Sequence, residues 1–136
     1  GSQRRCFTHI DDGIDALLRI LKNDKGCADG GIFNVGNPAN DRSIKELAQT
    51  MVRILGEFKG YEQLAKRVRI VEQSADKYYG GQYQDVVRRV PSIKRAGLKL
   101  GWEPRIGFDE AVRRTIASYT ETATQPDTRE GWTGRR

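Results

Sequence analysis

YYGGQYQDVVRRVPSIKRAGLKLGWEP, residues Tyr78–Pro104, is the most informative stretch of the sequence. Its first part combines three tyrosines, a Gly80-Gly81 turn and the adjacent arginines Arg88 and Arg89. Aromatic faces beside guanidinium groups suit a ligand that carries a flat ring and anionic groups. A loop of this length in a compact domain usually has a binding role. The alternative is an ordinary surface loop with solvated arginines, since charged loop residues are mostly exposed.

The second part of this stretch predicts a short helix. Ser92 is a suitable N-cap, and we expect the helix over Ile93–Leu98, with Gly97 or Gly101 near its end. Glu103-Pro104 then prevents any continuation, because the residue before a proline avoids the helical conformation.

The N-terminal segment predicts a strand followed by a helix. We expect Gln3–Ile10 to be a short strand and Asp11 or Asp12 to be the N-cap of the helix. Capping and the helix dipole explain these carboxylates better than a metal site does. We expect the helix to end in the polar segment Asn23–Gly26. Five apolar residues fall on one face of this helix: Ile10, Ile14, Leu17, Leu18 and Leu21.

The middle of the chain continues the alternation of strands and helices. Ile32–Gly36 has the pattern of an apolar strand, and Ser43 with Glu46 forms a capping-box spacing at the start of a second helix. The next segment, residues 56–66, is expected to be a loop or a short helix. We expect the second helix to direct four residues to the core: Leu47, Met51, Ile54 and Leu55.

The remaining segments complete an α/β pattern. Val68 and Ile70 alternate with charged residues, which predicts a half-buried strand. Apolar residues at helical spacing predict a last helix, and residues 123–136 lose this spacing and are expected to be a disordered tail. Strands alternating with helices indicate the α/β class. The last helix carries Phe108, Val112, Ile116 and Tyr119.

Composition narrows the classes of function. The chain has 136 residues and a net charge of +6, which favours an anionic partner. Nucleic acid is one such partner, but the basic residues are scattered and form no known nucleic-acid motif. Two cysteines and the single His9 do not make a disulfide framework or a metal cluster. There is no membrane-spanning run and no signal peptide, so we expect a protein of the reducing cytoplasm.

Several segments resemble one enzyme family. The ending PSIKRAGLKLGWEP is similar to that of extended short-chain dehydrogenases/reductases that act on nucleotide sugars. The segments RRCFTHIDDGIDAL, IFNVGNP and YGGQYQDVVRR resemble a narrower branch, the UDP-glucuronic acid dehydrogenase/decarboxylase domains of bifunctional polymyxin-resistance proteins. This resemblance implies the C-terminal, substrate-binding portion of a Rossmann-type α/β fold over residues 1–122, with the N-terminal cofactor half absent.

The resemblance also implies roles for individual residues. Arg89 matches the arginine proposed as the proton donor of the decarboxylation, and Arg5 matches a ligand of the substrate phosphates. Gln3 lies in the same binding segment, and Tyr83 matches a residue that contacts the nucleotide. Arg88 matches no functional position of the family.

Two motifs of such enzymes are missing from this sequence. No G-x-G-x-x-G or similar turn is present to hold the NAD pyrophosphate at a helix N-terminus. None of the five tyrosines has a lysine four residues later, so the family's Tyr-x-x-x-Lys pair is absent too. We therefore expect a C-terminal piece of a larger enzyme, inactive in the redox step by itself.

The expected reaction of the parent enzyme is the NAD-dependent oxidative decarboxylation of UDP-glucuronic acid to a UDP-4-keto-pentose. The parent is expected to be a cytoplasmic homo-oligomer involved in lipid A modification. A UDP-xylose synthase or another nucleotide-sugar epimerase or dehydratase is the alternative within this class. The alternative outside this class of enzymes is a basic α/β binding module for nucleic acid or protein.

Overall fold

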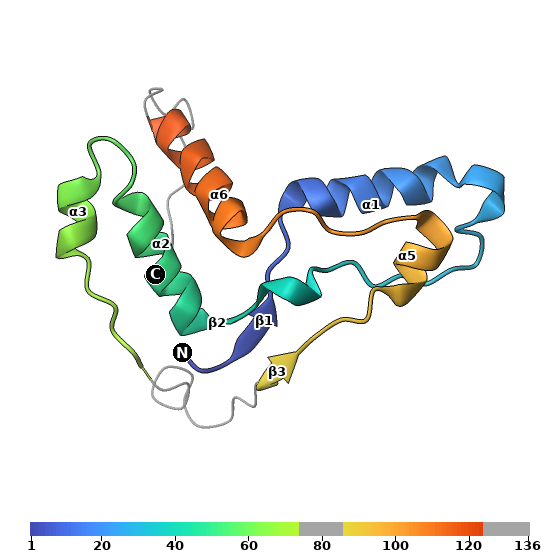
Figure 1. Ribbon diagram of the computed structural model, residues 1–136, viewed down its shortest axis with the longest axis horizontal. Helices are drawn as coiled ribbons and strands as arrows, with labels where there is room; N and C mark the ends of the chain where they lie inside the picture. Colours follow the sequence, from blue (N-terminus) through green and yellow to red (C-terminus); the bar gives the residue numbers. More distant parts are fainter. Residues whose placement is uncertain (74–85, 124–136) are drawn as a thin grey trace, which may run out of the picture.

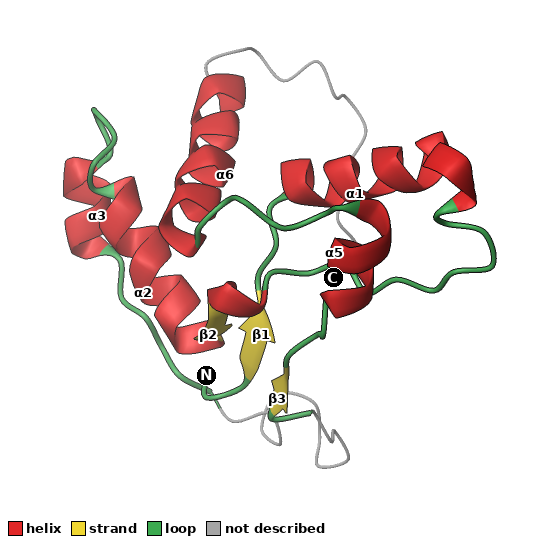
Figure 2. Ribbon diagram, turned by 45° about the vertical axis from the view of Figure 1, so that its right-hand side comes forward, coloured by secondary structure: helices red, strands yellow, loops and turns green. Residues whose placement is uncertain are grey.

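The computed structural model describes residues 1–73 and 86–123 (Figure 1). A small sheet lies between a group formed by α2, α3 and α6 and a second group formed by α1 and α5 (Figures 1 and 2). The described elements are β1 (Arg4–Cys6), α1 (Ile10–Lys22), η1 (Asp24–Gly26), η2 (Pro38–Asn40), β2 (Asp41–Ser43), α2 (Ile44–Leu55), α3 (Glu62–Arg67), β3 (Arg88–Arg89), α5 (Lys94–Leu100) and α6 (Phe108–Ala123).

The sheet is mixed and has the strand order β2-β1-β3. β1 and β2 are antiparallel, with Arg5 opposite Arg42, whereas β1 and β3 are parallel, with Arg5 opposite Arg89. Helices and strands of both orientations in one small unit confirm the α/β class. β2 was not expected from the sequence.

Two apolar clusters hold the helices in place. The first joins α1 to α5 around the fully buried Trp102 and Ala16. The second joins α2 to α6 around Ile54 and Phe108, and the ring of Phe7 extends it toward the sheet, 5.5 Å from the Phe108 ring. Full burial of a side chain such as that of Ile54 stabilises the fold by about 1.5–3 kcal/mol.

Helix ends agree with the sequence at some positions and differ at others. The capping box of Ser43 and Glu46 is confirmed at the start of α2. The N-cap of α1 is His9, whose Nδ1 accepts a hydrogen bond from the Asp11 amide at 3.2 Å, so the prediction of Asp11 or Asp12 was wrong. Ser92 is not a cap either, because α5 begins one residue later, after Ile93. Gly101, in a left-handed conformation with φ 59°, ends α5 as expected.

Two predicted strands are absent from the described part of the chain. Residues 32–36 have no regular secondary structure, and Asn34 donates to the Ser92 carbonyl at 3.2 Å. Gly36 lies close to Pro91, since a Cβ atom on Gly36 would be only 2.7 Å from the Pro91 ring. The segment beside residues 32–36 therefore includes a proline. Proline has no N–H group to give to a strand ladder. The segment around Val68 and Ile70 follows the short helix α3 and pairs with no strand among the described residues.

Several apolar side chains expected in the core are exposed. Met51 on α2 is 46% exposed and Tyr119 on α6 is 74% exposed, so the core prediction for Met51 was wrong. The whole apolar face of α1 is also open to solvent, because α5 packs on the opposite side, against Ala16 and Ile20. The exposed residues of this face are Ile10, Ile14, Leu17, Leu18 and Leu21.

Candidate functional site

Arg5 and Arg89 are brought together by the pairing of β1 and β3. They are register partners on parallel strands, and neighbouring strands lie roughly 4.8 Å apart. Since paired residues point to the same side of a sheet, both arginines belong to one face. Gln3 immediately precedes β1 and accepts a hydrogen bond from the Ile44 amide through its carbonyl at 3.0 Å. The alternation of side chains assigns Gln3 to the same face as Arg5.

Arg42 extends this row to the third strand. It is the partner of Arg5 on β2, so the order across the face is Arg42, Arg5, Arg89. We call these residues the arginine row. The Arg42 guanidinium group lies 5.4 Å from the centre of the Phe108 ring and donates to the Asp41 carbonyl at 2.8 Å. Arg42 could not be predicted from the sequence, because β2 was not expected.

The two members of the row that were predicted from the sequence, Arg5 and Arg89, differ in how they are held. Arg5 is half-buried, and its Nη1 donates to the Arg4 carbonyl at 2.7 Å and to the Val86 carbonyl at 2.8 Å. Arg89 is exposed, and its guanidinium group makes no hydrogen bond or ion pair with residues 1–73 or 86–123. Arg89 is therefore the member best able to bind an external anion.

The neighbouring arginines Arg4 and Arg88 occupy the opposite face, where both bind Asp41. Arg88 donates to Asp41 Oδ2 from Nε at 2.9 Å, and its Nη2 lies 2.8 Å from the same oxygen. Arg4 donates to Oδ1 from Nε at 3.2 Å and to the Asp41 carbonyl from Nη2 at 2.7 Å. We call these three residues the Asp41 clamp.

The electrostatics of the clamp favour an ionised carboxylate. Burial alone would raise the pKa of Asp41, but hydrogen bonds from Arg88 and Arg4 and their positive charges outweigh burial, so its pKa is lowered. Arg4 also donates to Glu46 at 3.2 Å, which connects the clamp to the capping box of α2. The charges of Arg4 and Arg88 are thus matched within the protein.

The arginine row can hold a ligand with more than one anionic group. Guanidinium groups donate in a planar fork that matches phosphate and carboxylate oxygens. Tyr83, the fourth residue implied by the family resemblance, lies outside the described residues. Histidine, cysteine and carboxylate residues do not gather into any metal-binding group within residues 1–73 and 86–123.

A dinucleotide does not fit the helix N-termini that the structure describes. The four longer helices α1, α2, α5 and α6 follow His9, Ser43, Ile93 and Gly107, and none follows a glycine-rich turn. A pyrophosphate needs such a turn to approach the backbone closely. The described residues therefore offer no NAD site of this type, and we derive no step of the reaction through NAD from them.

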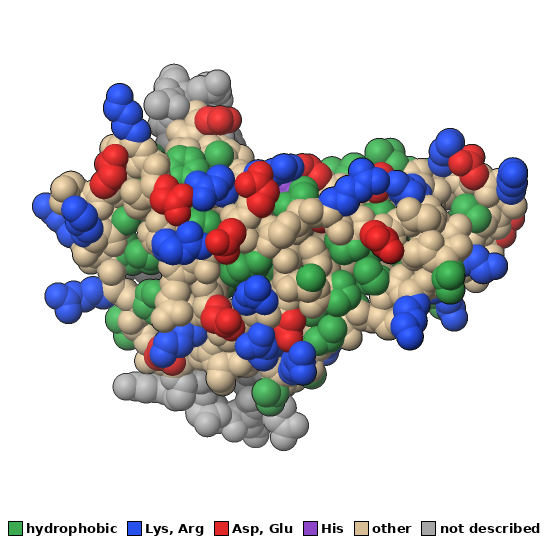
Figure 3. Space-filling model, viewed as in Figure 1, with side chains coloured by type: hydrophobic (Ala, Val, Ile, Leu, Met, Phe, Trp, Pro, Cys, Tyr) green, Lys and Arg blue, Asp and Glu red, His purple; other side chains and the backbone are tan. Residues whose placement is uncertain are grey.

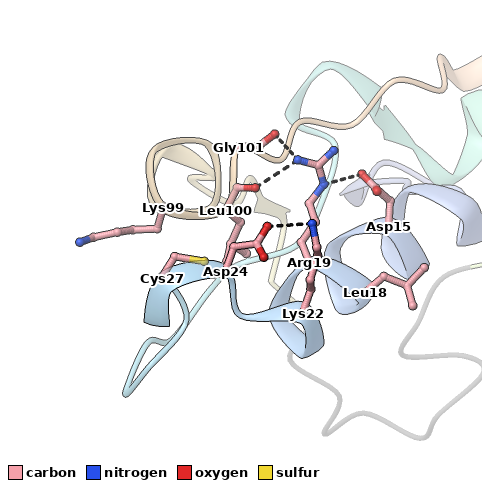
Figure 4. Close-up of a pocket in the computed structure, with 9 residues that line it drawn as sticks. All are labelled: Asp15, Leu18, Arg19, Lys22, Asp24, Cys27, Lys99, Leu100 and Gly101. Carbon is pink, nitrogen blue, oxygen red and sulfur yellow. Dashed lines mark hydrogen bonds and ion pairs between the residues drawn. The ribbon is translucent and has the colours of Figure 1, made fainter.

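Two cavities lie away from the arginine row. The cavity between α1 and α5, of about 600 Å³, contains Arg19, which bridges Asp15 at 3.0 Å and the Gly101 carbonyl at 2.6 Å (Figure 4). An apolar groove of about 800 Å³ between α2 and α6 is lined by Met51 and Tyr119, among others. Arg5 and Arg89 line neither space.

Surface charge is mixed on the visible face of the molecule. Basic and acidic side chains alternate there and do not gather into a single basic stripe (Figure 3). Many of them are paired, for example Arg53 with Asp109 at 2.6 Å and Arg113 with Glu57 at 2.6 Å. No described helix is long and apolar enough to cross a bilayer.

The mixed sheet and its two helix groups define a portion of an extended short-chain dehydrogenase domain, of the Rossmann-type α/β class. More narrowly, the chain belongs to the GDP-mannose 4,6-dehydratase family, whose model matches residues 1–115. The resemblance to enzymes that modify nucleotide sugars is thereby confirmed.

A solved structure supports the same assignment. The chain is similar to the PbgP3 protein from Burkholderia pseudomallei, with 40% identity and a TM-score of 0.75. The similarity covers 91% of this chain and 33% of that protein, so the chain spans about a third of its length. The family and the fold are therefore established, whereas the substrate and the reaction are matters for proposal.

Proposed function

We propose that this chain is the substrate-binding part of an NAD-dependent UDP-glucuronic acid oxidative decarboxylase that forms a UDP-4-keto-pentose. The observation that supports this best is the pairing of Arg5 with Arg89 on one face of the sheet. UDP-glucuronic acid carries a diphosphate and a sugar carboxylate, so it needs at least two cationic groups on one side. By itself the chain is inactive in the redox step.

The proposed reaction requires oxidation before loss of the carboxylate. Oxidation at the sugar 4-hydroxyl gives a ketone, which makes the carboxylate a β-keto acid. The bond between the carboxylate carbon and the ring then breaks, carbon dioxide leaves, and the electron pair remains as an enolate. A proton delivered to the ring carbon that lost the carboxylate then gives the keto pentose. NAD would accept the hydride of the first step, and it would be held mainly by the cofactor-binding half of the parent enzyme rather than by the described residues.

The residues of this chain bind and orient the substrate. Arg5 holds the diphosphate, Gln3 and Tyr83 contact the nucleotide part, and Arg89 orients the sugar carboxylate. Arg89 is assigned to this orienting role rather than to proton donation, because a guanidinium group releases its proton reluctantly. A carboxylate fixed by its fork instead keeps the scissile bond in the geometry required for loss of carbon dioxide.

The full-length gene product tests the reaction directly. It should be supplied with NAD and UDP-glucuronic acid while NADH absorbance and carbon dioxide are followed together. Equal amounts of both products support the oxidative decarboxylase. Carbon dioxide without net NADH indicates a UDP-xylose synthase, and neither product would refute the decarboxylase and leave an epimerase, a dehydratase or a binding module.

The role of Arg89 is tested by Arg89→Ala in the same protein. We expect turnover of UDP-glucuronic acid to fall by about 100-fold or more, because losing a charge-assisted contact in the reactive complex costs several kcal/mol. NAD binding should remain nearly unchanged. Arg69→Ala is the matched control, since Arg69 is exposed and belongs to no strand of the described sheet. Wild-type turnover of Arg89→Ala would contradict the assignment.

The setting of the enzyme is part of the proposal. A family of nucleotide-sugar enzymes with NAD as cofactor suits the cytoplasm, and we expect the parent enzyme to be a homo-oligomer. A basic module for nucleic acid would instead show strongly salt-dependent binding to random DNA. The mixed charge on the face shown in Figure 3 favours the nucleotide-sugar enzyme over this alternative.

A further inference from the structure

We propose that Asp41 is a positioning residue, which holds β3 against β1 and thereby keeps Arg89 beside Arg5 on the opposite face of the sheet. This inference rests on the proposed function. It assigns a role to a residue that neither the sequence nor the family resemblance singled out. Asp41 contacts no part of the arginine row through its carboxylate and acts through the backbone of the two strands.

The first step of the argument is the weakness of β3. This strand has only two residues, Arg88 and Arg89, and both are exposed. Its backbone link to β1 includes the hydrogen bond from the Arg4 amide to the Val87 carbonyl at 2.8 Å. So short a strand needs side-chain contacts to fix its position, because its few ladder bonds are open to water.

The second step is that Asp41 supplies such contacts to both strands at once. Its carboxylate oxygens are divided between them, with Oδ2 bound by Arg88 of β3 and Oδ1 bound by Arg4 of β1. The Asp41 side chain is only 11% exposed, so its hydrogen bonds are shielded from competition with water. Asp41 lies on β2 and thus ties the two other strands to a third.

The third step links this clamp to the arginine row. Adjacent residues of a strand point to opposite faces, so fixing Arg88 on one face fixes Arg89 on the other. The same holds for Arg4 and Arg5 on β1. Loss of the clamp therefore leaves Arg89 chemically intact but free to move away from Arg5. Two arginines that move independently bind a single two-anion ligand less tightly than two that are preorganised.

The test compares two ligands that differ only in the group assigned to Arg89. UDP-glucuronic acid carries the sugar carboxylate and UDP-glucose does not. Calorimetry on the full-length gene product gives the Kd of each ligand. Asp41→Asn retains the size of the side chain and removes its charge. We expect this variant to raise the Kd of UDP-glucuronic acid by about tenfold, which is the effect of losing one charge-assisted hydrogen bond. The Kd of UDP-glucose should change less than about threefold, since Arg5 remains on β1 beside β2.

A second variant and a control make the test independent of folding defects. Arg88→Ala breaks only the β3 side of the clamp and should reproduce the selective loss. Glu57→Gln, which removes the ion pairs of Glu57 with Arg53 and Arg113 after the C-terminal end of α2, should leave both Kd values unchanged.

The possible outcomes separate the two proposals. If Asp41→Asn and Arg88→Ala weakened the binding of both ligands equally, the positioning role would be overturned, because equal weakening would show a general loss of structure. Unchanged binding of both ligands would overturn it too. If the wild-type protein does not distinguish UDP-glucuronic acid from UDP-glucose, the proposed function itself fails, and the positioning role fails with it.

Discussion

Asp12 shows how one residue can suggest a metal site in sequence and serve as a structural hub in the fold. It is 5% exposed, and its carboxylate accepts hydrogen bonds from the amides of Arg105 and Ile106 at 3.0 and 3.1 Å. Its carbonyl accepts from the Trp102 indole at 3.0 Å. Asp12 therefore attaches the start of α1 to the segment that leads into α6. Neither helix capping nor metal binding describes this role.

Asp12→Ala should lower the free energy of unfolding by about 2–4 kcal/mol, because it leaves two shielded amides without acceptors. Chemical denaturation of the 136-residue chain measures this change. Asp15→Ala is the matched control on the same helix. Its carboxylate is 42% exposed and, among residues 1–73 and 86–123, pairs only with Arg19, so we expect a loss below about 1 kcal/mol. A loss for Asp12→Ala as small as that of the control would contradict the role of Asp12 as a hub.

The carboxylates near the sheet predict how stability changes with pH. The pKa of Asp41 is lowered by Arg88 and Arg4 in spite of burial, and that of Glu46 is lowered first by its hydrogen bond from the Ser43 amide. Groups with a lowered pKa in the folded state stabilise it above their unfolded values, which are about 3.9 for Asp and about 4.3 for Glu. This contribution disappears as pH falls through the folded-state pKa values.

We therefore expect the Tm to fall as the pH is reduced below about 5, with the loss continuing below the unfolded pKa values. Thermal denaturation at a series of pH values gives the slope. Asp41→Asn should make the slope shallower, since it removes one of the titrating groups. An unchanged slope in this variant would show that Asp41 does not contribute to the acid sensitivity.

At the scale of elements, α2 is the helix whose start could be predicted best from the sequence. Its capping box depends on residues three positions apart, Ser43 and Glu46, and both of its hydrogen bonds are present at 3.0 and 2.7 Å. Local signals of this kind need no knowledge of the rest of the chain.

Ser43→Ala should destabilise the chain by about 1 kcal/mol, the usual contribution of an N-cap side chain. Ser92→Ala is an informative control, because Ser92 precedes a helix in the sequence but its side chain caps nothing. We expect its effect to remain within about 0.5 kcal/mol. Denaturation of both variants under the same conditions compares them, and equal effects would contradict the assignment of the caps.

Strands were predicted less well than helices, and the reason is physical. A strand requires a partner, and the partner here is distant in sequence. Asp41 of β2 meets Arg88 of β3 across 47 positions. Ile32–Gly36 has the composition of a strand but lies beside Pro91, which cannot complete a ladder. The family resemblance identified Arg5 and Arg89 without strand pairing, whereas Arg42 and the Asp41 clamp became visible only with the register of the sheet.

At the scale of the whole molecule, the two helix groups leave one large apolar surface uncovered. The face of α1 exposes Leu17, Leu18 and Leu21 by 57%, 59% and 79%. Contiguous apolar surface of this kind usually marks a contact with another domain or chain. We therefore expect the 136-residue chain, studied by itself, to bind apolar dyes and to associate as its concentration rises.

Replacing Leu18 and Leu21 together by lysine should weaken this association at least about tenfold, because burial of each leucine contributes about 1.5–3 kcal/mol. Sedimentation of the chain at several concentrations measures the effect. Leu64→Lys, on α3 in the other helix group, is the control, because Leu64 is 51% exposed outside the α1 face. A wild-type chain that remains monomeric throughout would contradict the expectation.

The parallel pairing of β1 and β3 has a consequence for the order of folding. The Cys6 thiol and the Arg89 carbonyl, which meet at 3.5 Å, are 83 residues apart in sequence. Closing so long a loop opposes folding through chain entropy, and contacts between distant segments form slowly. Helices with local caps, such as α2, can form before this closure. Ligand binding at the proposed site on the arginine row would therefore report that the chain has folded completely, whereas helix content measured by circular dichroism would not.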